Sequence, residues 1–235
     1  MKFVNLLFDA DDTLFDFSQA SDHAFRILCA RQGIPDTPEV RRCYESINRA
    51  LWDAFDRGAI SKEYVVVERF VRFLRALDLD RDPAACNETY LAALGSGVYP
   101  MPHAQEVCRI LSRTHRLYLV TNAMASVQRS RLRGSVFAPY ITEAFISEEA
   151  GASKPSAAYF RYVLSRIPDA SARNALVIGD SPATDLLGAN NAGLPCCWYN
   201  RAGLPRPEGL RIDWEIRDLR ELYEICGNEE GAPQV

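Results

Sequence analysis

A short apolar run near the N-terminus ends abruptly in acids, and this transition constrains the fold more than any other stretch. Residues 3–8 (Phe-Val-Asn-Leu-Leu-Phe) are nearly all apolar and are followed by Asp9-Ala10-Asp11-Asp12. A continuously apolar run is typical of a central strand in a parallel sheet, which is covered on both faces. Asp9 and Asp11 would then lie at the carboxyl end of that strand, where ligands bind in open α/β sheets.

Asp9 and Asp11 stand two residues apart and face the same way if the extended conformation persists. Two like charges that close repel, and each raises the pKa of the other, so the pair needs a cation or a proton. Taken alone, the stretch is equally compatible with a strand that ends in solvated acids and a turn.

Residues 15–95 carry helical signals and no convincing strand. Apolar residues recur three or four positions apart between 40 and 55 and again between 66 and 77, as on the buried face of a helix. Thr37, Ser61 and Asp82 are residue types that cap helix N-termini, and a proline follows both Thr37 and Asp82. The sequence therefore predicts a helical block of about eighty residues, the size of a small domain.

From residue 96 onward, strands and helices alternate. Strands are predicted at 117–120, 144–146, 175–178, 196–199 and 214–216, of which 117–120 and 175–178 are of the buried type. Such alternation implies right-handed crossovers and a parallel sheet. We predict an α/β core from residues 1–14 and 96–226, a helical insertion at 15–95 and a flexible tail at 227–235.

The composition of the chain excludes several classes of function. A net charge of −4 and a pI near 5.5 argue against a nucleic-acid binder. The N-terminal apolar run is too short for a signal peptide or a membrane span, so we expect a cytoplasmic protein with no membrane partner. Seven cysteines without a C-x-x-C spacing predict reduced, mostly buried thiols, and three scattered histidines form no zinc pattern. An oxygen-ligand site for a hard cation remains open.

Three predicted strands end in polar groups that parallel pairing would gather at one edge. Asp9 and Asp11 follow the first, Thr121-Asn122 the second, and Asp180 a third, with Asp185 five residues on. Lys154 stands at a predicted helix start. Carboxylates, a hydroxyl and a lysine converging on one sheet edge are typical of a phosphoryl-transfer site.

Four motifs occur in order: residues 9–14 (Asp-Ala-Asp-Asp-Thr-Leu), Thr121-Asn122, Lys154-Pro155 and residues 179–185 (Gly-Asp-Ser-Pro-Ala-Thr-Asp). In their order and spacing they resemble the haloacid dehalogenase-like hydrolase superfamily. The resemblance implies a Rossmann-like doubly wound parallel sheet core with an inserted all-helical C1 cap domain. Such a cap would act as a lid that excludes water and contacts the leaving group, with hinges at 15–18 and 95–100.

The resemblance also implies a role for each motif residue. Asp9 would be the nucleophile that forms an aspartyl phosphate, and Asp11 would protonate the leaving oxygen and then deprotonate the attacking water. The Thr121 hydroxyl and the Asn122 backbone N–H would bind phosphoryl oxygens, and Lys154 would neutralise charge on the phosphate and on Asp9.

Mg²⁺ is the implied cofactor. Asp9, Asp180 and the backbone carbonyl of Asp11 would hold the ion, and Asp185 fits a partner that contacts it through water. Asp185 has a second interpretation, because an acid in the first turn of a helix is favoured by the helix dipole. Asp12 is interpreted as a turn acid without a catalytic duty.

Within the superfamily the chain is most similar to the pyrimidine 5′-nucleotidase branch, through residues 8–15, 58–70 and 197–200. It departs from that branch at Asp12 and Ala123, where Glu and Gly are common. We therefore expect a Mg²⁺-dependent phosphomonoester hydrolase that acts on a small phosphorylated metabolite, foremost a nucleoside 5′-monophosphate, as a monomer or homodimer. The alternatives are a sugar-phosphate phosphatase or a phosphomutase and, less favoured, a 2-haloacid dehalogenase or a non-catalytic binding protein.

Overall fold

The computed structural model describes residues 3–227, which form two compact units. One unit combines the chain up to Phe17 with the chain from Val98 onward, and the other is Ser18–Gly97. The chain therefore passes between the units within 15–18 and 95–100, the two segments that the family resemblance implies as hinges. The tail predicted at 227–235 lies, from residue 228 on, outside the described residues.

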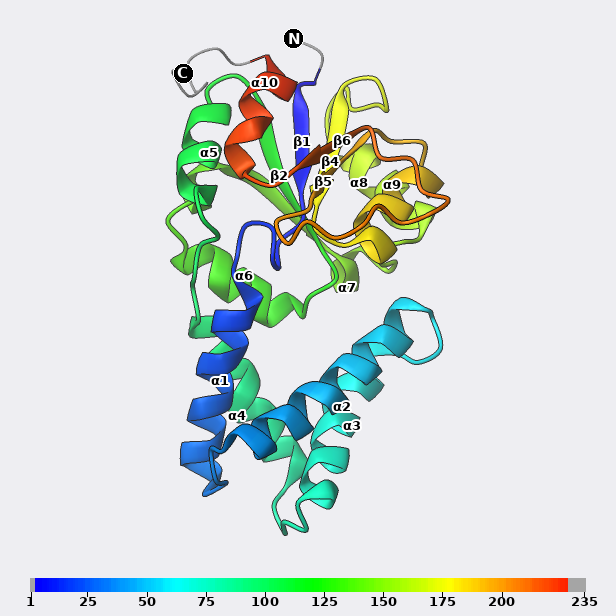
Figure 1. Cartoon of the computed structure of the whole chain (residues 1–235). Coiled ribbons are helices and arrows are strands. Elements are labelled where there is room, and N and C mark those ends of the chain that lie inside the picture. The colour runs from blue at the N-terminus through cyan, green and yellow to red at the C-terminus, as the bar shows by residue number, and fades with distance from the viewer. Residues whose placement is uncertain (1–2, 228–235) are drawn as a thin grey trace. The chain divides into compact units, whose positions relative to one another are not determined.

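The first unit is built on a six-stranded sheet in which every neighbouring pair is parallel (Figure 1). The strands are β1 (Asn5–Phe8), β2 (Arg116–Thr121), β3 (Ile141–Ile146), β4 (Ala175–Gly179), β5 (Cys196–Tyr199) and β6 (Trp214–Ile216). Their order is β3-β2-β1-β4-β5-β6. The predicted doubly wound parallel α/β core is confirmed.

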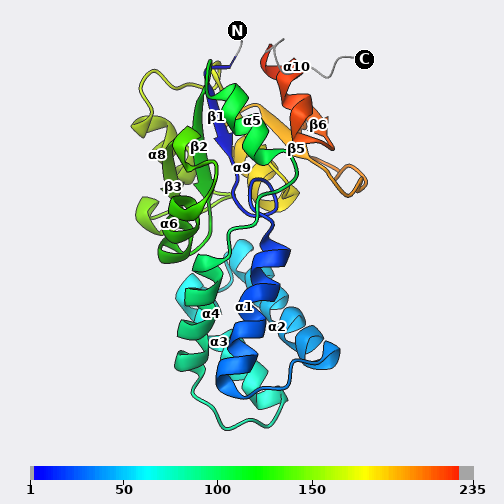
Figure 2. The ribbon, with the colours of Figure 1, turned by 90° about the vertical axis from the view of Figure 1, so that its left-hand side faces the viewer.

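β1 lies inside the sheet, between β2 and β4, and both of its faces are covered by apolar side chains. Leu6 and Phe8 belong to one buried cluster, which includes residues of α5 (Ala104–Leu111) and α10 (Leu222–Cys226). Leu7 belongs to the other, which includes residues of α8 (Ala157–Arg166) and α9 (Leu187–Asn191). Helices thus cover both sides of the sheet (Figure 2). The apolar run of β1 is continuous because both of its faces are buried under these helices.

The remaining helical segments of this unit are short. They are α6 (Ala125–Gly134), η1 (Ala138–Tyr140), α7 (Ser147–Ala150), η2 (Pro182–Leu186) and η3 (Leu219–Glu221). The segment η2, which follows β4, has π-helical geometry, a form that often occurs at functional sites.

The second unit consists of helices: α1 (Phe17–Gln32, from Ser18 on), α2 (Pro38–Asp56), α3 (Lys62–Ala76) and α4 (Pro83–Ser96). The three predicted N-caps are confirmed, because the side chains of Thr37, Ser61 and Asp82 accept hydrogen bonds from the backbone N–H groups of Val40, Tyr64 and Ala84. Aromatic rings fill its interior, namely Phe25, Tyr44, Phe70, Phe73 and Tyr90.

All seven cysteines are free thiols and six of them are buried, as the sequence predicts. Among the described residues, no helix is long and apolar enough to cross a membrane.

Candidate active site

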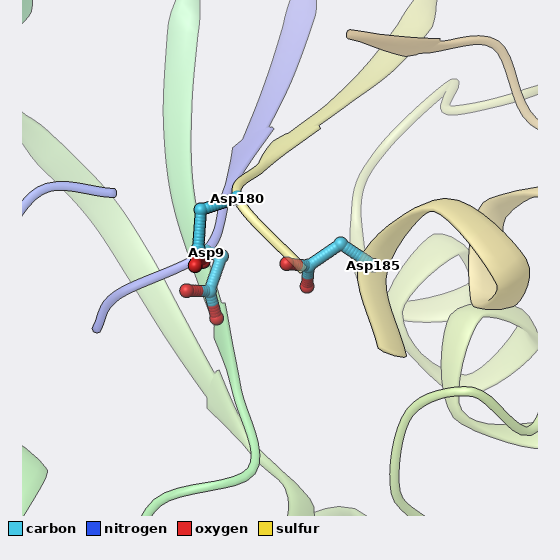
Figure 3. Close-up of side chains that lie close together, drawn as sticks. All are labelled: Asp9, Asp180 and Asp185. Atoms are coloured by element: carbon cyan, nitrogen blue, oxygen red, sulfur yellow. The ribbon is translucent and has the colours of Figure 1, made fainter. Parts of the chain in front are cut away.

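The strand order reverses between β1 and β4, and the first acidic residues of the site lie at the carboxyl ends of these two strands. Phe8 pairs with Ile178, and the backbone N–H of Asp9 donates to the Ile178 carbonyl at 2.8 Å. Asp180 follows β4 directly. This reversal is the topological switch point, where open α/β sheets bind ligands. The fold therefore places Asp9 and Asp180 side by side at the expected edge (Figure 3).

Lys154 joins the acids from a loop. Its ammonium group donates to Asp9 Oδ1 at 2.5 Å, to Asp185 Oδ1 at 2.6 Å and to the Val120 carbonyl at 3.0 Å, and its side chain is buried. The predicted helix start is wrong by a few residues, since α8 begins at Ala157 with Ser156 as its N-cap. Lys154 is thus held by three oxygens and is not part of the helix.

Asp185 lies in the first turn of η2, where it is buried and forms an ion pair with this lysine. Its second oxygen, Oδ2, accepts the backbone N–H of Ser181 at 3.1 Å. Gly179 lets Asp185 come this close, because a Cβ at position 179 would lie 2.3 Å from Asp185 Oδ2. The local sequence Gly-Asp-Ser-Pro-Ala-Thr-Asp therefore folds so that its last acid returns to the end of β4.

Asp180 is fixed through Thr13, whose hydroxyl accepts the Asp180 backbone N–H at 3.1 Å and lies 3.4 Å from Asp180 Oδ1. The Trp198 indole N–H donates to the Asp180 carbonyl at 2.9 Å. Burial, together with the charges of Asp185 and Asp12, raises the pKa of Asp180 to about 8 against the opposing effect of Lys154.

The site gathers three carboxyl groups around one lysine. Burial raises the pKa of Asp9 well above its usual value, and Asp185 and Asp180 act in the same direction, whereas Lys154 lowers it. Although burial disfavours the Lys154 ammonium, the carboxylates of Asp185 and Asp9 outweigh that effect and raise its pKa. A second cation would reduce the electrostatic repulsion among these carboxylates.

The donor set fits a hard divalent cation. Asp9, Asp180 and Asp185 each offer one carboxylate oxygen, and these atoms lie within 4.8 Å of one another. Figure 3 shows the three side chains converging from the ends of β1 and β4 and from η2. Mg²⁺ prefers a few carboxylates with retained waters, so this arrangement suits it.

The second predicted motif lies at the end of β2, and the side chain of its Asn122 is hydrogen-bonded to the backbone of Lys154. The Asn122 side chain donates to the Lys154 carbonyl and accepts the Lys154 N–H, both at 2.9 Å. The Thr121 N–H donates to the Tyr159 hydroxyl at 2.9 Å, and the same hydroxyl donates to the Phe145 carbonyl at 2.7 Å. Tyr159 thus supports this loop, a role that its place among the apolar residues of a helix did not indicate.

Asp11 does not join the three clustered acids. Its Oδ1 forms an ion pair with Nη1 of Arg131, a buried residue of α6. The sequence motifs do not include Arg131. The one local signal is its spacing, four residues after Val127, which places both on one buried helix face.

Asp12 occupies a turn, as interpreted from the sequence. Its backbone has φ = 60°, and its Oδ1 accepts the backbone N–H of Phe17, the first residue of α1, at 3.0 Å. The acid therefore supports the point at which the chain leaves the sheet for the inserted unit.

Residues 6–199 match the family model described as haloacid dehalogenase-like hydrolase, so the chain belongs to that family and is a hydrolytic enzyme. It is 38% identical over 228 residues to the HAD-hydrolase YfnB of Bacillus subtilis, covering 97% of each chain. It is 31% identical to the pyrimidine 5′-nucleotidase PynA of Streptococcus pneumoniae, covering 95% of each, and 29% identical to the pyrimidine 5′-nucleotidase YjjG of Escherichia coli, covering 96% of this chain and 98% of YjjG.

Solved structures show the same fold. A crystal structure of Bacillus subtilis YfnB bound to magnesium superposes with a TM-score of 0.90 and covers 96% of this chain and 99% of YfnB. A 2-haloacid dehalogenase from Pseudomonas syringae is 28% identical, with a TM-score of 0.69 over 96% of this chain and 98% of the dehalogenase. The resemblance stated from the sequence motifs is confirmed.

Proposed function

We propose that this hydrolase is a Mg²⁺-dependent phosphomonoesterase that acts through an aspartyl phosphate on Asp9. The observation that carries the proposal is the Lys154 ammonium held between Asp9 and Asp185, with the Asp180 carboxylate within 4.8 Å of both acids. A carboxylate nucleophile needs no base to activate it, but it must approach an anionic phosphate. A lysine beside such a carboxylate, in a cluster of acids that suits a divalent cation, fits that task.

The proposed reaction has two steps, the formation and then the hydrolysis of the aspartyl phosphate. The Asp9 carboxylate attacks phosphorus, the bond from phosphorus to the ester oxygen breaks, and Asp11 gives its proton to the leaving oxygen. Water then attacks the phosphorus of the aspartyl phosphate, Asp11 takes the proton of that water, and the Asp9 carboxylate is released. The phosphoryl oxygens would be bound by the Thr121 hydroxyl and the Asn122 N–H, with Lys154 supplying positive charge.

Mg²⁺ would be held by Asp9, Asp180 and the Asp11 carbonyl, with Asp185 as a partner through water, and it would supply the charge that offsets repulsion between nucleophile and phosphate. This assignment is supported by the carboxylate cluster and by the magnesium bound in the similar YfnB structure. We assign Ser18–Gly97 as the C1 cap, because it is an all-helical insertion between β1 and β2.

The proposed substrates are pyrimidine nucleoside 5′-monophosphates. Support comes from PynA and YjjG, which are pyrimidine 5′-nucleotidases and align with this chain over 95% or more of its length. Sugar phosphates are the alternative class. Measuring inorganic phosphate release from a panel of nucleoside monophosphates and sugar phosphates decides between them, and a phosphomutase would convert hexose phosphates with little net release.

The nucleophile is tested with 4-nitrophenyl phosphate in the presence of Mg²⁺. We expect hydrolysis by the wild type and loss of at least about 10³-fold in Asp9→Asn, because the amide cannot form the covalent intermediate. Equal activity of Asp9→Asn and wild type would contradict the assignment. Turnover of a 2-haloacid without phosphatase activity would instead favour the dehalogenase, to which the chain is also structurally similar.

A further inference from the structure

Arg131 presents a buried guanidinium to the carboxylate of Asp11, and the four motifs assign it no role. The ion pair joins Nη1 of Arg131 to Oδ1 of Asp11 across 120 residues of sequence. The Arg131 side chain is 1% exposed, whereas that of Asp11 is 28% exposed. The guanidinium is therefore a fixed part of the interior, and the carboxylate that it holds faces partly toward solvent.

The surroundings of Arg131 restrict its guanidinium. Its Cζ atom lies 4.4 Å from the centre of the Phe15 ring, and Nη1 also donates to Gln128 Oε1 at 3.2 Å. Phe15 is itself buried and belongs to the loop that follows Asp11. Because a buried cation is costly without an anionic partner, the contact with Asp11 stabilises one orientation of both side chains.

The two oxygens of Asp11 are therefore not equivalent. Oδ1 accepts the hydrogen bond from Arg131, whereas within residues 3–227 no hydrogen bond reaches Oδ2. A carboxyl group that exchanges a proton first with a leaving oxygen and then with water needs one oxygen free for both transfers.

We propose that Arg131 is a positioning residue that anchors Oδ1 of Asp11 and leaves Oδ2 for both proton transfers. This role rests on the proposed phosphatase function. The proton on Oδ2 passes to the ester oxygen as the bond from phosphorus to oxygen breaks. Oδ2 receives a proton back when water attacks the aspartyl phosphate, so the carboxyl group is regenerated at each turnover.

The test compares three esters that share an aromatic ring but differ in the basicity of the leaving oxygen: 4-nitrophenyl, phenyl and benzyl phosphate. The 4-nitrophenolate ion leaves with little help, whereas benzyl alcohol must be protonated as it leaves. The parameter measured is kcat/KM, since it reports the steps up to departure of the alcohol. In Arg131→Met we expect kcat/KM to fall about 10- to 100-fold for benzyl phosphate and less than about threefold for 4-nitrophenyl phosphate.

Asp11→Asn should show the same dependence of kcat/KM on the leaving group. The double variant should lose no more kcat/KM than Asp11→Asn alone, because both substitutions disable the same proton transfer. Arg131→Lys should recover part of the benzyl phosphate activity. The matched control is Arg129→Met on the same helix, which removes an exposed ion pair to Glu149 and should leave all three esters within about twofold.

Equal loss on all three esters in Arg131→Met, or multiplied losses in the double variant, would overturn the positioning role while leaving the phosphatase intact. If the wild type hydrolyses none of the esters or nucleotides, the proposed function fails and the role of Arg131 with it. Circular dichroism and thermal unfolding verify folding of each variant. Should Arg131→Met not fold, Arg131→Lys decides by the same criterion, an unequal loss across the three leaving groups.

Discussion

Lys154 is the residue on which the electrostatics of the site depend most. Its ammonium group separates Asp9 from Asp185 in a buried setting, with Asp180 as a third nearby acid. Replacing Lys154 by Met leaves these carboxylates without their protein cation, which should lower the free energy of unfolding by about 3 to 5 kcal/mol. Urea unfolding without divalent cations measures the change.

The control for Lys154→Met is Arg129→Met, whose exposed ion pair should contribute less than about 1 kcal/mol. Addition of Mg²⁺ should recover part of the stability lost in Lys154→Met, since a bound ion replaces the missing charge. A Lys154→Met protein as stable as the wild type without cations would show that the lysine is not what holds the acids together.

Gly179 governs the approach of Asp185 to β4. A Cβ at this position would lie 2.3 Å from Oδ2 and 2.4 Å from Cγ of Asp185, which is itself bound to Lys154 and Ser181. Gly179→Ala should therefore destabilise the protein by about 1 to 3 kcal/mol through overpacking. It should also lower activity, because Asp185 must move.

Urea unfolding and phosphate release test Gly179→Ala against Gly134→Ala. At Gly134 the new Cβ would meet the end of the Val98 side chain at 3.3 Å, which requires a much smaller adjustment. Equal effects of the two substitutions would argue against the close approach of Asp185 as the reason for glycine at position 179.

At the scale of elements, the N-caps of the inserted helices allow a local test. Thr37 Oγ1 accepts the Val40 N–H at the start of α2. Thr37→Ala should lower the free energy of unfolding by about 1 kcal/mol and speed amide exchange in the first turn of α2, whereas Thr37→Ser should retain the cap. Unchanged exchange in Thr37→Ala would show that the hydroxyl does not stabilise this helix end.

These caps, like the strands, could be predicted because their signals are local. All six strands were predicted, although β3 begins at Ile141 and not at 144. Thr37, Ser61 and Asp82 stand within three residues of the N–H groups that they accept. For such elements both partners of the interaction lie within a few residues of each other in the sequence.

Interactions between residues far apart in the sequence could not be predicted from local patterns. The Arg131 ion pair spans 120 residues and the Tyr159 hydrogen bond to Thr121 spans 38. The stretch that forms α6 carries arginines at 129, 131 and 133, a composition typical of a solvated helix, so its buried face was not predicted. For the motif residues, the parallel pairing of the predicted strands and the resemblance to a family supplied the long-range placement, and their catalytic roles stay predictions.

At the scale of the whole molecule, the proposed cation links ligand binding to folding. The three carboxylates come from the ends of β1 and β4 and from η2, and only the folded chain brings them together. An ion that binds only the folded state stabilises it by mass action, by about 2.7 kcal/mol at a hundred times its dissociation constant. We therefore expect the melting temperature of the wild type to rise with Mg²⁺ and to return when the ion is chelated.

Asp180→Asn should abolish this Mg²⁺-dependent rise, because it removes a carboxylate ligand without changing the size of the side chain. Asp80→Asn, the same change at an exposed acid of the inserted unit, should retain it. Amide exchange locates the effect: protection by Mg²⁺ should concentrate at residues 9–13 and 179–186. The proposed site would be contradicted if Mg²⁺ still raised the melting temperature of Asp180→Asn, or if Mg²⁺ slowed amide exchange only in the inserted unit. Either result would place the cation away from the carboxylates beside Lys154.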